Sequence, residues 1–190
     1  MNNTIINIIK VKEDYRIEPY RDAFRSLDMN PNKFMCSIEA LVSRVAKGNK
    51  LPSINPIVDL TNAISLKYLI PLGAHNIDSF DGDIELRYTN GNDCFIPINK
   101  TTEEAEFPEN ELVYVSGNDI KTRRWTWRQG NNGKIIETTS NIFIPLDGFK
   151  NFNQEELVKA RDELALIFKN QLNAKVQVGL VDKDNNIYKF

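Results

Sequence analysis

The side chains that could carry chemistry include the only histidine of the chain, His75. Its imidazole has an unperturbed pKa close to neutrality, so it can exchange a proton in the physiological range. In an ester-hydrolysis site this group could orient a water molecule or act as a general base. His75 ends the short connection Pro-Leu-Gly-Ala-His at residues 71–75, where a histidine that only bonds a backbone carbonyl is an equally ordinary interpretation. Both interpretations stay open.

A second group of candidates lies in the basic window, residues 120–136, which has no acidic residue. Arginine matches the geometry of phosphate and carboxylate groups, and tryptophan can stack on a base or on a substrate side chain. The alternative is a core strand with two buried tryptophans and a solvated arginine edge. Because alternate residues of a strand share a face, the window predicts one face formed by Arg123, Trp125, Trp127 and Gln129.

The element that would position His75 is a helix beginning after Asn55. The Asn55 side chain can accept a hydrogen bond from a free N–H of the first turn, and Pro56 needs no partner at the first helical position. Asp59 places a negative charge near the positive end of the helix. Pro71 prevents continuation, so the helix is expected to end just before the connection that carries His75.

These residues form a family pattern. The segments Ser53-x-Asn55-x-x-Val58-Asp59-x-Thr61-Asn62, Pro71-Leu72 and His75-x-x-Asp78 resemble the editing domain of the bacterial phenylalanyl-tRNA synthetase β subunit. The text Thr122-Arg-Arg-Trp-Thr-Trp-Arg-Gln129 resembles the free-standing versions of that domain, and the resemblance is strongest over residues 34–149. Two departures stand out. Gly73 occupies the family's histidine position, two residues before His75, and Arg128-Gln129-Gly130 replaces a Gly-Gly-Glu segment.

The resemblance implies a trans-editing deacylase, which hydrolyses the ester of a mischarged tRNA and holds the small amino-acid moiety in a pocket. The missing glutamate implies an amino acid other than tyrosine. The alternative is a non-catalytic module of the same fold that binds tRNA, another RNA or an amino acid. A complete ligase is not expected, because the aminoacylation motifs are absent.

The resemblance and the residue types together assign candidate roles. Catalytic roles fall to Asn62 and His75. The expected substrate-binding residues are Asp59, Thr61, Pro71, Gly73, Trp125, Trp127, Gln129, Glu137 and Asn141. The expected RNA-binding residues are Lys121, Arg123, Arg124, Arg128 and Lys134.

The other elements are predicted from apolar periodicity and turn residues. Helices are expected over residues 19–27, from Ser37, and after a capping-box-like start at Asn153-Gln-Glu-Glu156. A loop is expected over residues 101–110. Strands are expected over residues 4–11, 84–88, 94–98, 111–116, 121–129, 135–144, 174–181 and 187–190, with hairpin turns at Asn90-Gly91 and Gly117-Asn118. This order predicts an α+β fold with a mostly antiparallel sheet and helices packed on one side, forming one domain over residues 1–190.

Composition limits the possible partners. The 190 residues carry a formal net charge of −2, whereas proteins that wrap nucleic acid are usually basic, so tRNA would be held through a local patch with salt-sensitive affinity. Cys36 and Cys94 match no metal-ligand spacing, which predicts reduced thiols, a cytoplasmic location, no metal and no cofactor. No apolar run approaches the roughly 20 residues that span a bilayer, so no membrane partner is expected. The oligomeric state is left open.

Overall fold

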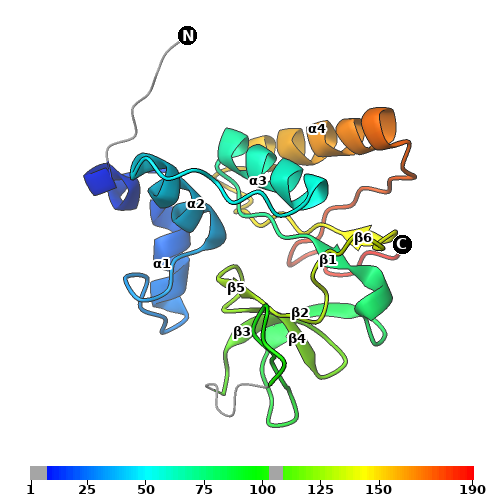
Figure 1. Ribbon diagram of the computed structural model, residues 1–190. Coiled ribbons are helices and arrows are strands. Elements are labelled where there is room, and N and C mark those ends of the chain that lie inside the picture. Colours follow the sequence, from blue (N-terminus) through cyan, green and yellow to red (C-terminus); the bar gives the residue numbers. More distant parts are fainter. Residues whose placement is uncertain (1–7, 103–108) are drawn as a thin grey trace.

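Four helices and two antiparallel sheets make up the part of the chain that the computed structural model describes, residues 8–102 and 109–190 (Figure 1). The helices are α1 (Glu18–Ser26), α2 (Ser37–Ala46), α3 (Pro56–Tyr68) and α4 (Gln154–Leu172), with 3-10 turns η1 (Ile8–Glu13) and η2 (Ile77–Ser79). The strands are β1 (His75–Asn76), β2 (Ile84–Tyr88), β3 (Leu112–Ser116), β4 (Asp119–Arg123), β5 (Arg128–Gln129) and β6 (Ile142–Phe143). The helices lie to one side of the larger sheet, which confirms the expected α+β architecture.

Helix α3 forms where its local sequence predicts it. Asn55 Oδ1 accepts a hydrogen bond of 2.9 Å from Val58 N, and Pro56 is the first helical residue. At the other end Leu69 adopts a left-handed conformation, and its N–H bonds back to Ser65 O. The apolar side of α3 packs against α4 around Ile64. The chain therefore leaves α3 abruptly and enters the centre of the molecule at residue 70.

The larger sheet has the order β2-β3-β4-β5, with every neighbouring pair antiparallel. Tyr114 lies opposite Thr122, and Thr122 lies opposite Gln129. Residues directly opposite each other share a face of the sheet, so these three form a line across three strands that we call the polar row. An apolar cluster includes the strand residues Val113, Val115 and Ile120, on the face opposite the polar row, together with Phe95 from the preceding loop.

A two-stranded ribbon of residues 71–76 and 142–147 joins the helices to the sheet. Asp147 N donates to Pro71 O over 3.1 Å, and Gly73 N donates to Pro145 O over 3.3 Å. His75 lies opposite Phe143 where β1 pairs with β6. Figure 1 shows this ribbon between helices α3 and α4 and the four-stranded sheet. Two segments that are far apart in the sequence therefore meet over the middle of the fold.

The basic window does not form the continuous strand expected over residues 121–129. Strand β4 ends at Arg123 because Arg124 and Trp125 adopt left-handed backbone conformations, with φ of 47° and 59°, and such residues interrupt a strand. The chain then folds back, so that Arg128 in β5 pairs with Arg123. The predicted shared face of arginine and tryptophan side chains is therefore wrong.

Trp125 instead enters a core between α1 and α2. Its ring centroid lies 6.3 Å from that of Phe24 and 6.2 Å from that of Tyr20. Only 8% of Trp125 is exposed. The turn after β4 thus attaches the sheet to the first two helices, both of which occur where the sequence predicts them.

Other predictions of regular structure are wrong. Strand β2 pairs with β3, not with residues 94–98, and an ion pair of 2.8 Å between Arg87 and Asp93 closes the turn at residues 90–91. In the region 135–144 only β6 is a strand, and residues 174–181 and 187–190 form none. Residues 8–11 belong to η1, while residues 4–7 and most of the expected loop, 103–108, lie outside the described residues.

Asn153 does not cap α4 through its side chain. Its Oδ1 accepts from Phe149 N and its Nδ2 donates to the Tyr20 hydroxyl, each over 2.8 Å. It therefore ties the start of α4 to α1. Along the described ranges, 8–102 and 109–190, every helix is too short or too polar to span a bilayer.

Candidate functional site

The ribbon places His75 directly on the polar row. Its Nε2 lies 3.4 Å from Thr122 Oγ1, and its Nδ1 lies 3.4 Å from Gln129 Nε2. The Gln129 amide is itself fixed by donating to Ala74 O over 2.8 Å. Only 1% of His75 is exposed. The connection at residues 71–75 thus meets Gln129 on the sheet, and His75 is a buried strand residue, not a turn residue.

His75 is held in its neutral form. Burial, and secondarily the positive charge of Lys121, lower the pKa of its imidazole to about 4. A neutral imidazole has one nitrogen that can accept a hydrogen bond or a proton. At pH 7 this site therefore offers an uncharged hydrogen-bond acceptor in a dry environment.

Lys121 belongs to this buried layer and does not form part of an exposed RNA-binding surface. Tyr114 pairs with Thr122 while Val115 pairs with Ile120, so Lys121 is the extra residue of a β-bulge, a feature that re-aims side chains. Its ammonium group donates to Asp119 Oδ2 over 2.7 Å and to Ser79 O over 2.8 Å. Lys121 is fully buried, which removes it from the proposed RNA contacts.

Gly73 lies close against the imidazole of His75. A Cβ atom on Gly73 would lie 3.3 Å from His75 Nε2 and 3.9 Å from Pro145 Cγ. The first of these separations is tighter than ordinary van der Waals contact, so alanine would press on the imidazole. The absence of a side chain at Gly73 therefore leaves room for the imidazole, which itself remains buried. The substrate-binding role of Gly73 stays a prediction.

Asp147, at the far end of the ribbon, is a site residue that the sequence did not reveal. Its Oδ1 accepts from the Tyr114 hydroxyl over 2.7 Å and from Trp125 Nε1 over 2.6 Å. Burial raises the pKa of this carboxyl to about 6, although both hydrogen bonds act in the opposite direction. In the sequence Asp147 precedes Gly148, a pair typical of an exposed turn, and no local pattern distinguishes such an aspartate from a buried one.

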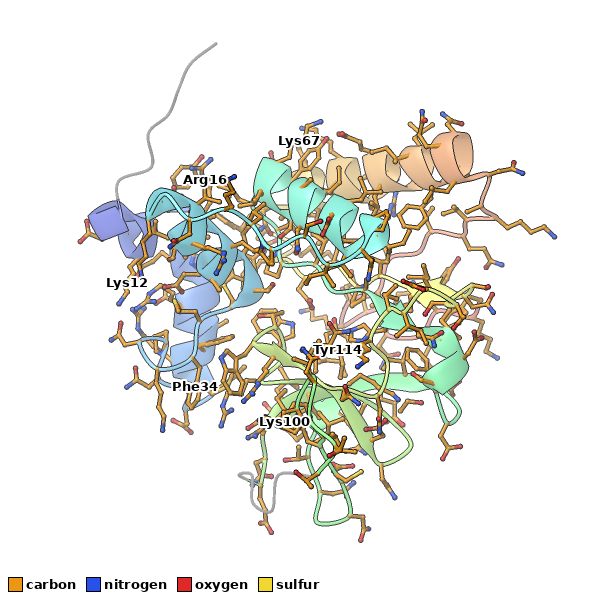
Figure 2. The ribbon with its side chains drawn as sticks, in the orientation of Figure 1. Lys12, Arg16, Phe34, Lys67, Lys100 and Tyr114 are labelled. Carbon is orange, nitrogen blue, oxygen red and sulfur yellow. The ribbon has the colours of Figure 1, made fainter. Side chains whose placement is uncertain are left out.

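Figure 2 shows Tyr114 rising from the sheet toward the helices. It is the first member of the polar row, and its hydroxyl reaches Asp147. Thr122, the next member, reaches His75. The row therefore connects the two titratable residues of the ribbon, with Gly73 between them along the ribbon. These are the residues on which an active site could be built.

The three candidate site residues on α3 form side-chain hydrogen bonds only with nearby residues, or none. Asp59 accepts from Ser53 Oγ and from Ile54 N, and it thereby fixes the entry to the helix. Thr61 is buried and donates to Val58 O over 2.9 Å. Asn62 is half-buried, and its side chain makes no hydrogen bond within the described residues. Asn62 is therefore the α3 side chain that remains available to a ligand.

Arg123 and Arg124 are held by a buried carboxylate. Glu111 accepts from Arg123 Nε and Nη2, both over 2.8 Å, and from the backbone N of Arg124 over 3.1 Å. The Arg124 guanidinium also lies over two rings, 3.8 Å from the Phe34 centroid and 4.6 Å from the Trp127 centroid. These arginines therefore fix the turn after β4, and Trp127 packs on them.

The remaining predicted residues lie nearer the surface. Glu137 and Asn141 are exposed, and Asn141 Nδ2 donates to Asp78 Oδ1 over 2.9 Å. Arg128 and Lys134 are half-buried, and Lys134 Nζ donates to Asn131 Oδ1 over 3.0 Å. The predicted site residues are thus divided among the buried ribbon site, helix α3, the turn after β4 and the surface. We call Arg128 and Lys134 the peripheral basic edge.

Two surface hollows, of about 560 Å³ and 310 Å³, lie elsewhere, around the start of α4. The second is lined by Arg16 and Lys67, which pair with Asp14 and Glu163. Its cations are therefore already compensated, and we assign the hollows no role. Within residues 8–102 and 109–190, no three histidine, cysteine or carboxylate side chains gather as metal ligands.

Comparisons with known proteins agree with the family resemblance. A family model described as the B3/4 domain matches residues 19–178. No curated protein matches the chain. Among solved structures, the chain is similar to an N-terminal fragment of the phenylalanyl-tRNA synthetase β subunit from Pyrococcus horikoshii, with 15% identity and a TM-score of 0.42 over 56% of this chain. The match covers 39% of that fragment's length.

Proposed function

Because the chain belongs to the B3/4 domain family, we propose that it is a trans-editing deacylase that hydrolyses the ester bond of a mischarged tRNA. The observation that carries the proposal is the neutral imidazole of His75, held between Thr122 and Gln129 with Gly73 beside Nε2. An aminoacyl ester is already activated, so its hydrolysis needs mainly an oriented water and stabilisation of the developing oxyanion.

The proposed roles follow from these contacts. His75 Nε2 accepts a hydrogen bond from the attacking water, or from the Thr122 hydroxyl that positions it. Asn62, which has no partner of its own among the described residues, orients the substrate from the side of α3. Burial, and secondarily Lys121, keep the imidazole uncharged, so that a proton acceptor is present at neutral pH. No metal or cofactor is required by this scheme.

A second candidate is a non-catalytic module that binds a charged tRNA or its amino-acid moiety. The specific observation in its favour is the burial of His75, of which only 1% is exposed. A base this deeply buried reaches substrate only if the ribbon or the residues above it move. In this candidate His75 is a structural residue of the polar row.

Hydrolysis of a panel of mischarged tRNAs separates the two candidates. We expect Asn62→Ala to lower the deacylation rate by roughly 10²-fold, because misplacement of substrate or water costs about that much. The matched control is Asn170→Ala, which changes the same residue type at an exposed position of α4. His75→Gln is expected to be similarly slow. If no charged tRNA is hydrolysed above the spontaneous rate, the binding-module candidate replaces the enzyme.

We propose that tRNA contacts the peripheral basic edge, Arg128 and Lys134. Replacing both with glutamate is expected to weaken tRNA binding and to reduce the dependence of log K on log salt concentration by roughly two phosphate contacts. The measurement is fluorescence anisotropy of labelled tRNA at several salt concentrations. The control, Lys175→Glu with Lys183→Glu, makes the same charge change at two exposed positions. Equal salt slopes in both variants would remove this edge from the interface.

A further inference from the structure

Asp147 is a buried carboxylate that lacks a positive partner. It is 9% exposed, and both of its side-chain hydrogen bonds, from Tyr114 and Trp125, go to Oδ1. Within the described residues no side chain donates to Oδ2, and no lysine, arginine or histidine forms an ion pair with Asp147. One carboxylate oxygen is therefore left for something outside the folded chain.

A bare carboxylate in this position is costly. Buried charges in folded proteins are normally paired, because desolvation of an isolated charge is strongly unfavourable. The fully buried side-chain atoms without a partner in the described residues are Glu39 Oε2 and Thr126 Oγ1. Asp147 Oδ2 is not one of them, so solvent or a ligand group can still reach it. Burial raises the pKa of the Asp147 carboxyl, which reflects the same cost of desolvating its charge.

The surroundings of Asp147 suit a cation. The rings of Tyr20, Trp125 and Phe149 lie together, with centroids 5.0 Å apart for Tyr20 and Phe149 and 5.9 Å apart for Trp125 and Phe149. Aromatic faces attract ammonium groups, more strongly where water is excluded. Trp125 also fixes the carboxylate through its indole N–H. Here Tyr20 and Trp125 are buried, so the rings pack on one another and exclude water from the carboxylate, which strengthens its attraction for a cation.

We propose that Asp147 Oδ2 binds a protonated amine of the aminoacyl group of the substrate, an inference that rests on the proposed deacylase function. Asp147 lies on the same ribbon as Gly73 and His75. It is four residues along its strand from Phe143, the residue opposite His75, a separation of about 13 Å. A ligand whose amine pairs with Asp147 therefore extends along the ribbon toward Gly73. The amine is an ammonium group on the amino-acid side chain, because an α-ammonium group lies only two bonds from the ester carbonyl and could not pair with Asp147 while that carbonyl lies at His75.

The test uses the indole N–H of Trp125, which donates to Asp147 Oδ1, as a reporter in ¹H–¹⁵N NMR spectra. The chain has two tryptophans, so Trp127→Phe assigns the signal. Three probes are titrated at pH 7: leucinamide, N-acetyl-leucinamide and N-acetyl-lysinamide. The first carries only an α-amine, the second carries none, and the third carries only a side-chain amine.

We expect N-acetyl-lysinamide to shift the Trp125 signal and both leucinamide and N-acetyl-leucinamide to leave it unchanged. Asp147→Asn keeps an acceptor for Tyr114 and Trp125 and should weaken binding by 10-fold or more, because it removes one partner of a buried charge pair. Asp83→Asn, at an exposed position, is the control. A shift with leucinamide as large as that with N-acetyl-lysinamide would contradict recognition of a side-chain amine.

Three results would overturn the inference: equal shifts with all three probes, no shift with any, or unchanged binding by Asp147→Asn. The deacylation assay tests the enzyme independently of the probe titration. If wild type and Asp147→Asn hydrolyse the same charged tRNAs equally, including one charged with lysine, the enzyme stands and the amine site does not. If no charged tRNA is hydrolysed, the deacylase proposal fails and the probe titration still decides the amine site.

Discussion

Replacing Glu111 with alanine is expected to lower the free energy of unfolding by about 3–5 kcal/mol, the cost of removing one partner from a buried ion pair. The Glu111 and Arg123 side chains are 3% and 4% exposed, and the two form a bidentate pair at 2.8 Å. The same carboxylate contacts the Arg124 guanidinium at 3.2 Å. Urea denaturation at pH 7 measures the loss.

The control is Glu109→Ala, because Glu109 is an exposed glutamate two residues earlier in the chain. Substitutions at such surface positions usually stay within about 0.5 kcal/mol. A loss below about 1 kcal/mol in Glu111→Ala would contradict the structural role given to these arginines. If the expected loss is observed, charge reversal at Arg123 or Arg124 would test folding and not RNA binding.

Arg123 and Arg124 illustrate why the basic window could not be understood from sequence alone. Local pattern favours a strand through residue 129, but the left-handed residues Arg124 and Trp125 depend on distant partners. Glu111 binds the arginines, and Phe34 receives the Arg124 guanidinium. The window itself contains five cations and no anion, so the pattern predicts an exposed patch. The carboxylate that binds Arg123 and Arg124 lies outside the window, 12 and 13 residues earlier in the chain.

The start of α3 shows the opposite case. Asn55 and Pro56 determine the helix start through contacts within one turn, so the residues themselves contain the information. The same holds for the β3–β4 hairpin, whose two-residue turn is Gly117-Asn118. Elements whose stabilising contacts are local could therefore be predicted, together with the connection that carries His75.

The chemistry of the site required the pairing of remote segments. His75 was identified as a candidate from its residue type, but its burial follows from the pairing of β1 with β6 and from Thr122 and Gln129 on the sheet. Asp147 was missed because its partners, Tyr114 and Trp125, come from another part of the chain. Sequence patterns identified one end of the ribbon and gave no indication of the other.

The two ends of the ribbon are expected to give opposite pH dependences of stability. The His75 pKa is about 4 in the folded chain and 6.5 for an unperturbed histidine, so the unfolded state binds the proton first as pH falls. Stability is therefore lost between pH 6.5 and 4, by about 3 kcal/mol in all. The variant His75→Gln lacks this term, so relative to wild type it should gain about 3 kcal/mol from pH 7 to pH 4.

Asp147 has the reverse sign. Its pKa is about 6 in the folded chain against 3.8 for an unperturbed aspartate, so the folded state keeps the proton longer as pH rises. Stability is therefore lost between pH 3.8 and 6, again by about 3 kcal/mol. Relative to wild type, Asp147→Asn should gain this amount from pH 4 to pH 7. Tyr114 and Tyr20, which contact Asp147, have pKa values raised above 10 and stay protonated throughout.

Urea denaturation of wild type and both variants at pH 4, 5, 6 and 7 measures these differences. Other carboxylates titrate in this range, including Asp93, whose pKa is lowered mainly by its hydrogen bond from Arg87 against the effect of burial, but they are common to all three proteins and cancel in each difference. Between pH 4 and 6 the contributions of His75 and Asp147 to the free energy of unfolding have opposite signs and largely cancel in wild type. Each variant keeps only one of the two contributions, so its stability relative to wild type should change with pH. Differences that do not vary with pH would mean that neither group is buried as described, and the neutral imidazole that carries the proposed chemistry would lose its basis.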